Sequence, residues 1–271
     1  MSRPYVFCIS ASTAARRMAK SFAFQAQFVY NRTYVQFLNR ERKPAVTQEF
    51  LVDFSQITLS DFEKELEQTE LLPSREVLHE DLHVRFDRLR WLGLVTLADL
   101  LAELKSSQKM KDLARKSGLD EEYLAILRRE VNNCQPKAVN LFEFPGIPAE
   151  AVQKLAQHGI RNTPQLFAFI QSPAERAALA AQTSVDEAVI LELTHLTDVS
   201  RIRWVGANFA RLLVDAGCDT VHKVMKADYA SLYRRLMQIN EERQYFKGKF
   251  GENDMRLTVL LAQKVPQVIV Y

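Results

Sequence analysis

The sequence predicts a mainly α-helical protein, and two observations support that fold class. The 271 residues include only 8 glycines and 9 prolines, and long stretches are rich in Leu, Ala, Glu, Lys and Arg, which form helices readily. From about residue 74 onward, residues recur at a fixed spacing, which indicates a duplicated unit. We therefore expect tandem helical repeats, preceded by a small N-terminal region of mixed α and β character and followed by a C-terminal strand.

Residues 1–72 are the predicted N-terminal region. Residues 5–9 and 49–54 are rich in aromatic and β-branched side chains, which is typical of short strands. Between them, residues 11–38 show helical spacing, and the segment 1–40 carries six basic side chains and no acidic one. Organellar transit peptides share such a composition. Ser60 and Glu63 form a capping box that should open a helix reaching to about residue 72.

The repeat has no gaps. Every recurring residue is separated from its copy by the same number of positions as Gly93 is from Gly159, and this number is the offset of the repeat. The residues that recur at this offset are Leu89, Gly93, Leu100, Leu113, Ala114, Asp120, Glu121 and Leu127, and their copies are Leu155, Gly159, Leu166, Leu179, Ala180, Asp186, Glu187 and Leu193. A diverged third copy follows at a shorter offset, with Leu213 and Gly217 in place of Leu155 and Gly159. The predicted units are residues 73–140, 141–198 and 199–271. The glycines should end helices, and Thr96, Asn162 and Thr220 should cap the next ones.

Residues 201–213 are the most informative stretch. An apolar turn ends at Val205 and Gly206, and a new helix begins near Asn208 and stops before Gly217. This stretch resembles the helix-hairpin-helix units of ligases, polymerases and repair proteins, which bind DNA without reading its sequence. Over residues 74–271 the chain resembles more closely an uncharacterised family of tandem helix-hairpin-helix repeats, which also has a terminal segment like residues 261–271. The resemblance implies an array of helix-hairpin-helix units.

A hairpin of this type can bind phosphate at the start of its second helix, where backbone N–H groups are unpaired and the helix dipole is positive. The third hairpin has a glycine beside three arginines. Its candidate nucleic-acid-binding residues are Arg201, Arg203, Trp204, Gly206, Ala207, Asn208 and Arg211. Trp204 replaces the first glycine of the family pattern, and it could stack on a base or fill a core.

The other two hairpins depart further from the pattern. In the second, Gly146 is present, but Pro148 replaces the other glycine and lacks an N–H donor. In the first, Glu80 and Leu82 hold these positions with Asp81 between them, and the two carboxylates would repel phosphate. The third hairpin is therefore the predicted site of contact with a polyanion.

Charge and motifs restrict the function. The net charge is only +3, but residues 201–271 carry twelve basic against seven acidic side chains.

The string from His79 to His83 matches the H-E-x-x-H zinc motif, but Asp81 adds a charge where such helices carry uncharged residues, and the extended metal-binding continuation is absent. Three widely spaced cysteines argue against disulfides and fit a reducing, cytoplasmic setting. No run is apolar enough to span a membrane.

We therefore expect a non-enzymatic protein without metal or cofactor that binds nucleic acid independently of sequence; DNA is favoured, but the sequence does not decide between DNA and RNA. The basic N-terminal segment would be a second contact. The alternative is a scaffold or assembly subunit in which degenerate hairpins contact other proteins, and the near-neutral charge and two altered hairpins favour it. A zinc hydrolase built on His79 and His83 is a distant third hypothesis.

Overall fold

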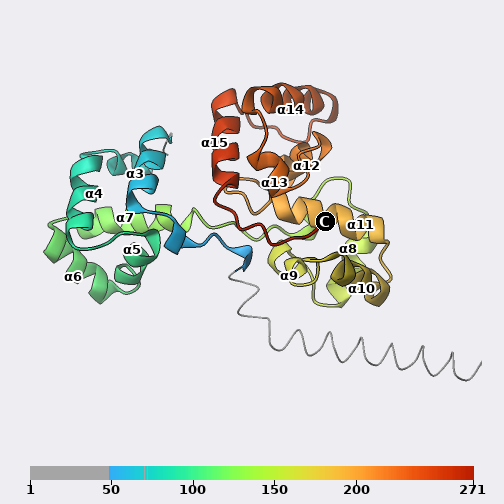
Figure 1. Ribbon diagram of the computed structural model, residues 1–271, viewed down its shortest axis with the longest axis horizontal. Helices are drawn as coiled ribbons and strands as arrows, with labels where there is room; N and C mark the ends of the chain where they lie inside the picture. The colour runs from blue at the N-terminus through green and yellow to red at the C-terminus, as the bar shows by residue number, and fades with distance from the viewer. Residues whose placement is uncertain (1–48, 70, 72) are drawn as a thin grey trace, which may run out of the picture. The chain divides into compact units, whose positions relative to one another are not determined.

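A computed structural model describes residues 49–69, 71 and 73–271, and these residues are helical, with no β-strand among them (Figure 1). The expected mainly α fold class is therefore confirmed. The strand predicted at residues 5–9 lies outside the described residues. The strands predicted at residues 49–54 and at the C-terminus are wrong.

The helices of the first two units start at matching positions. The first unit contains α4 (Leu82–Trp91), α5 (Leu97–Glu103), α6 (Ser107–Ser117) and α7 (Glu121–Asn132). The second contains α8 (Ala149–Gln157), α9 (Thr163–Phe167), α10 (Pro173–Thr183) and α11 (Glu187–Val199). The starts of α9, α10 and α11 follow those of α5, α6 and α7 at the offset of the sequence repeat, so the sequence repeat is a repeat of helices.

The third unit keeps only the first two helices of this pattern. Its α12 (Ala207–Asp215) and α13 (Val221–Met225) follow α8 and α9 at the shorter offset that relates Gly217 to Gly159. Two longer helices then follow, α14 (Tyr229–Arg243) and α15 (Glu252–Ala262), and α15 packs against both α13 and α14.

Capping explains why these boundaries recur. Thr96, Asn162 and Thr220 each accept a hydrogen bond from the backbone N–H three positions later and so cap α5, α9 and α13. Gly93, Gly159 and Gly217 follow the preceding helices with φ of +84°, +81° and +78°. This left-handed conformation is strained for residues with a Cβ atom. The recurring glycines and caps thus fix where each hairpin helix ends and the next one begins.

The same two backbone hydrogen bonds connect an incoming segment to the start of α5 and of α9. Each pair joins the residues on either side of the cap to a short segment that runs antiparallel to it. The pairs are Leu97 N–H to the Ile57 carbonyl and Leu59 N–H to the Val95 carbonyl, and Thr163 N–H to the Val139 carbonyl and Leu141 N–H to the Arg161 carbonyl. In the first unit this segment leads into α3 (Leu59–Gln68) and a 3-10 helix, η2 (Pro73–Leu78). In the second it leads into the short 3-10 helix η3 (Leu141–Glu143).

The start of the described region differs from expectation. Asp53 accepts a hydrogen bond from the N–H of Ser55 and caps a 3-10 helix, η1 (Phe54–Gln56), so the backbone turns where a strand would continue. Thr58 caps α3 by accepting from the N–H of Asp61. The helix is therefore capped ahead of the predicted capping box at Ser60, and it ends at Gln68.

The described residues contain two large hydrophobic cores and a small third cluster, in which Phe50 packs against Phe167. The first core contains side chains between Val52 and Cys134 and is centred on α3, α4, α5 and α7, where Phe62, Phe86 and Leu127 are fully buried. The second core runs from Val139 to Val265 and includes side chains of both the second and the third units. The second and third units thus share one core, whereas the first unit shares its core with residues 52–66 of the predicted N-terminal region.

The C-terminal residues are held by side chains instead of a strand ladder. Only the N–H of Val270 bonds to backbone, to the Gln171 carbonyl at 2.8 Å, while Arg176 donates to the Val270 carbonyl at 2.9 Å. The ring of Tyr271 stacks on His195 with centroids 4.8 Å apart, and its hydroxyl donates to Asp198 Oδ2 at 3.1 Å. The predicted strand fails because no strand in the described part of the chain offers an edge to pair with.

We predict that Gly217→Ala lowers the free energy of unfolding by about 1–2 kcal/mol, because alanine must adopt the left-handed conformation at φ +78°. Gly206→Ser is the matched control, since Gly206 has an extended backbone at φ −85° and serine is a good N-cap. Urea denaturation measures both. Equal effects of the two substitutions would contradict the conformational explanation.

Candidate nucleic-acid interface

The third hairpin consists of two helices joined by a short turn. α11 ends at Val199, and α12 begins at Ala207 with Gly206 as its N-cap residue. Between them, Trp204 adopts a left-handed conformation at φ +69°, the conformation that Gly146 adopts at φ +83° in the equivalent position of the second hairpin. The two hairpins therefore share a left-handed residue at this position, and Trp204 bears conformational strain there that a glycine would not.

Arg201 lies in the protein interior. Its side chain is fully buried, and its guanidinium donates to the carbonyls of Glu49 and Pro266, each at 2.8 Å, and to that of Phe50 at 3.3 Å. It also pairs with Asp198 Oδ1 at 3.1 Å. Burial lowers the pKa of Arg201 from its usual range, although the nearby carboxylate of Asp198 opposes that shift. Arg201 thus connects three chain segments and does not face solvent.

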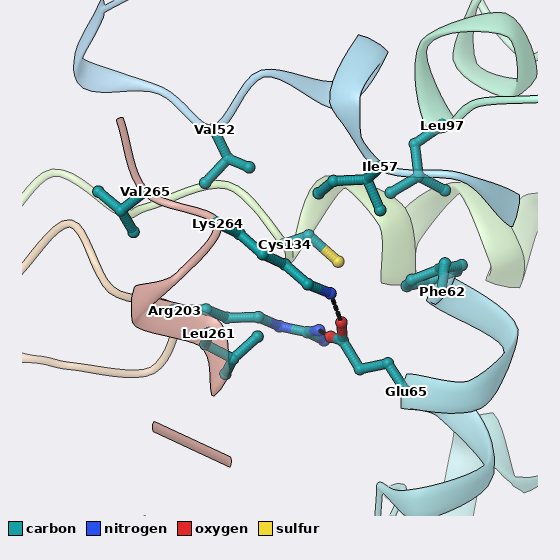
Figure 2. A pocket seen from close by; sticks show the side chains of 10 residues that line it. All are labelled: Val52, Ile57, Phe62, Glu65, Leu97, Cys134, Arg203, Leu261, Lys264 and Val265. Carbon is teal, nitrogen blue, oxygen red and sulfur yellow. Dashed lines mark hydrogen bonds and ion pairs between the residues drawn. The ribbon is translucent and has the colours of Figure 1, made fainter. Parts of the chain in front are cut away.

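Arg203 is buried between two carboxylates. One terminal nitrogen pairs with Glu130 on α7 at 2.5 Å, and the other pairs with Glu65 on α3. Figure 2 shows Arg203 and Lys264 converging on Glu65 from one side of an otherwise apolar pocket. Glu130 also pairs with Arg75 at 2.5 Å. This charge cluster, formed by Glu65, Arg75, Glu130, Arg203 and Lys264, links the first core to the third hairpin.

Arg211 contacts the turn of the second hairpin. Its Nε donates to the Pro145 carbonyl at 2.9 Å, and its NH1 pairs with Glu192 at 2.7 Å and with Asp215 at 3.2 Å. A Cβ atom added to Gly146 would lie 3.6 Å from the guanidinium. The glycine that could let a phosphate approach this turn instead accommodates an arginine of the third unit.

The predicted site residues therefore separate into two groups. Arg201, Arg203 and Arg211 are at most 5% exposed and are engaged inside the protein. Trp204 is 55% exposed, and its ring lies 4.2 Å from the Arg203 guanidinium. Trp204 therefore does not fill a hydrophobic core. Gly206 and Asn208 are exposed, and Ala207 is half-buried. The structure brings the seven residues into one hairpin but does not assemble them as a solvent-facing cradle, because the three desolvated guanidinium groups take internal partners.

Sequence reasoning missed the acidic partners. Glu130 lies among buried residues of α7 such as Tyr123, Leu127 and Val131, and only 2% of its surface is exposed. An acidic residue at an apolar helical position signals a buried ion pair. That signal was present in the sequence, but the sequence does not say which cation pairs with it.

The H-E-x-x-H string does not form one helical face. His79 follows η2, and its Nε2 lies 2.8 Å from the Leu66 carbonyl, whereas His83 lies on α4 with its Nδ1 2.7 Å from Glu63 Oε1. Among residues 49–69, 71 and 73–271, no group of three or more His, Cys, Asp or Glu side chains is placed to hold a metal ion. Within the same part of the chain, no helix is both long and apolar enough to cross a bilayer.

Fold and site together define a protein of helical repeats whose hairpin arginines form internal ion pairs. Residues 145–248 match a family described as Domain of unknown function (DUF4332), a stretch that begins at the turn of the second hairpin and ends after α14. Comparisons with curated proteins and with solved structures found no significant match.

We predict that Arg203→Met lowers the free energy of unfolding by about 3–5 kcal/mol, because it leaves the buried carboxylates of Glu65 and Glu130 without their shared cation. Arg115→Met is the control, since Arg115 is exposed and pairs with Asp112 on the surface, and it should cost less than about 1 kcal/mol. Guanidinium denaturation of both variants measures the difference. A loss below about 1 kcal/mol for Arg203→Met, the range of an exposed pair, would show that the charge cluster does not stabilise the fold.

The buried cysteines should resist modification. Burial raises the pKa of Cys134, which lines the pocket in Figure 2, to about 12, and it also raises that of Cys218. Because the thiolate is the reactive form, we expect both thiols to react with a disulfide reagent at pH 8 only as fast as the protein opens. A Cys8→Ser background removes the third thiol. Rapid labelling of two thiols in the folded protein would contradict this expectation.

Proposed function

We propose that this protein is a non-enzymatic assembly subunit that binds another protein through its helical repeats. The observation that carries the proposal is the burial of the arginines that suggested phosphate binding. Arg201, Arg203 and Arg211 all make internal ion pairs, and Arg201 and Arg211 also donate to backbone carbonyls. These side chains support the fold instead of offering charge to a ligand.

The free energies of the two kinds of contact favour a structural role for the hairpin arginines. Breaking a buried ion pair by removing one partner costs about 3–5 kcal/mol. A hydrogen bond to a charged group contributes only about 1.5–3 kcal/mol net. Moving Arg203 from its two carboxylates to a phosphate would therefore cost more than the new contact returns. The hairpin arginines pair with carboxylates of the same chain and are not available to a phosphate. A role in binding another protein is therefore favoured over a role in binding phosphate.

Purification of the tagged full-length chain from the cells that make it, under nuclease treatment, tests the assembly function. We expect a second protein in stoichiometric amount. The mass of the complex, measured by analytical ultracentrifugation, should be well above the 31.1 kDa of the chain alone. A chain that sediments alone would overturn the proposal. So would a chain that, purified in parallel without nuclease, carries nucleic acid but no second protein.

Sequence-independent nucleic-acid binding is the second candidate, and the start of α12 favours it. Gly206 faces open space, with no atom within 4 Å of a Cβ added to it, and the half-exposed ring of Trp204 lies near it in sequence. No side chain caps this helix. Backbone N–H groups at the first turn could therefore meet a phosphate without any of the buried arginines.

Asn208→Glu separates this candidate from the assembly function. An acid in the first turn interacts favourably with the helix dipole, by about 0.3–1 kcal/mol, so the fold should be retained, whereas a phosphate at that turn would be repelled. If the chain binds a short duplex, anisotropy at low salt should show at least tenfold weaker binding for this variant. Gln238→Glu, which adds the same charge on α14, should leave binding unchanged. Equal weakening by both variants would exclude this turn as the contact.

A further inference from the structure

The first unit exposes large apolar side chains on and just after its hairpin helix. Trp91 is 92% exposed, Val95 61% and Val84 52%. Such side chains commonly occur singly on soluble proteins, but a group rimmed by polar residues marks a site of interaction. The indole of Trp91 leaves apolar area in contact with water, so covering it would be energetically favourable.

These residues follow one side of α4. Val84, Arg88 and Trp91 are spaced at i, i+4 and i+7, so they share the outer face of the helix, while Phe86 and Leu89 point into the first core. Val95 follows the helix, beyond Gly93. We call Val84, Arg88, Trp91 and Val95 the Trp91 face.

The internal repeat provides a comparison for the Trp91 face. At the equivalent positions of the repeat, the second unit carries only polar side chains, which are Glu150, Lys154, Gln157 and Arg161. In that unit Glu150 pairs with Lys154 at 2.8 Å on the surface of α8. The third unit has Asn208, Asp215 and Asp219 where the first has Val84, Trp91 and Val95. Apolar side chains at these positions are thus specific to the first unit and are not required by the repeat fold.

The same comparison shows an unbalanced charge. Val84 replaces the acid that would pair with Arg88, as Glu150 pairs with Lys154. Arg88 is exposed, and in the described part of the chain its only hydrogen bond is to the Gly118 carbonyl, at 3.2 Å, with no ion pair. Lys116, in the last turn of α6 before Gly118, is likewise exposed and has no ion pair in that part. The Trp91 face therefore combines apolar area with uncompensated positive charge.

We infer that the Trp91 face binds an acidic amphipathic segment of a partner protein, an inference that rests on the proposed assembly function. Apolar side chains of the segment would cover Val84, Trp91 and Val95. A carboxylate would pair with Arg88, in the place that the Glu150 carboxylate takes beside Lys154 in the second unit.

Other occupants fit this face less well. Nucleic acid can stack on Trp91, but the aliphatic side chains of Val84 and Val95 offer it no such contact. A second copy of the chain docked symmetrically on the same face would place Arg88 near its own copy, and like charges would oppose the contact. An acidic protein segment satisfies both the apolar and the charged parts of the face.

Selection from a library of random helix-length peptides displayed on phage, against the full-length chain, tests the inference. Val84→Glu/Trp91→Gln is the comparison variant, because it gives the first unit the residues of the second at two exposed positions. We expect enriched peptides with net negative charge and apolar residues at helical spacing. A synthetic copy of the best peptide should bind the variant more than tenfold more weakly, since a buried tryptophan dominates such contacts. Arg88→Gln should also weaken it.

Phe142→Gln is the matched control, because Phe142 is 55% exposed on η3 of the second unit and does not belong to the Trp91 face, so its loss should not change peptide binding. The inference is overturned if the enriched peptides are neutral or basic, or if they bind the comparison variant equally well. It is also overturned if Trp91→Gln abolishes instead the binding of a DNA duplex or of anionic lipid vesicles, or dissociates a dimer seen by sedimentation.

The purification described for the assembly function separates the two proposals. A partner that Val84→Glu/Trp91→Gln still retains would overturn the Trp91 face as its binding site and leave the assembly function standing. A partner lost from this variant but kept by Phe142→Gln would support both. A wild-type chain without any stoichiometric partner would overturn the assembly function itself.

Discussion

The ion pairs of Arg203 are the interaction on which the arrangement of the described units depends. Glu65 on α3 and Glu130 on α7 are both nearly buried, and two desolvated carboxylates this close repel unless a cation lies between them. Arg203 supplies that cation from the third hairpin. The first core therefore gains stability from the turn of the third hairpin, so the repeats are not energetically independent.

This dependence explains why the sequence suggested a different role for the hairpin. An arginine pair around an apolar turn looks like a phosphate site when only neighbouring residues are considered. The partners of Arg203 are 138 and 73 residues away in sequence, and no local pattern connects them. A guanidinium has the same donors for a carboxylate as for a phosphate. Local sequence can thus identify a guanidinium that needs an anion but not which anion it meets.

Helix boundaries were predictable because their causes are local. The caps at Thr96, Asn162 and Thr220 and the glycines before them depend on residues within one turn, and the repeat displays them three times. The C-terminal strand was wrong because strand formation requires a partner edge, which is a tertiary property. Of the candidate site, the turn between the two helices was predictable from local residues, whereas the sequence left open whether Trp204 is exposed or buried. The burial of the arginines depends on distant packing.

Arg201 has a consequence for the order of folding during synthesis. Its guanidinium binds carbonyls of Glu49 and Phe50, which leave the ribosome early, and of Pro266, which is made much later. The first core can collapse as soon as residue 134 has emerged, but the segment at its N-terminal edge must wait for the rest of the chain. Until Arg201 emerges, the carbonyls of residues 49 and 50 stay hydrated and this edge is open to chaperones and proteases, and the contact with Pro266 forms only at the end of synthesis.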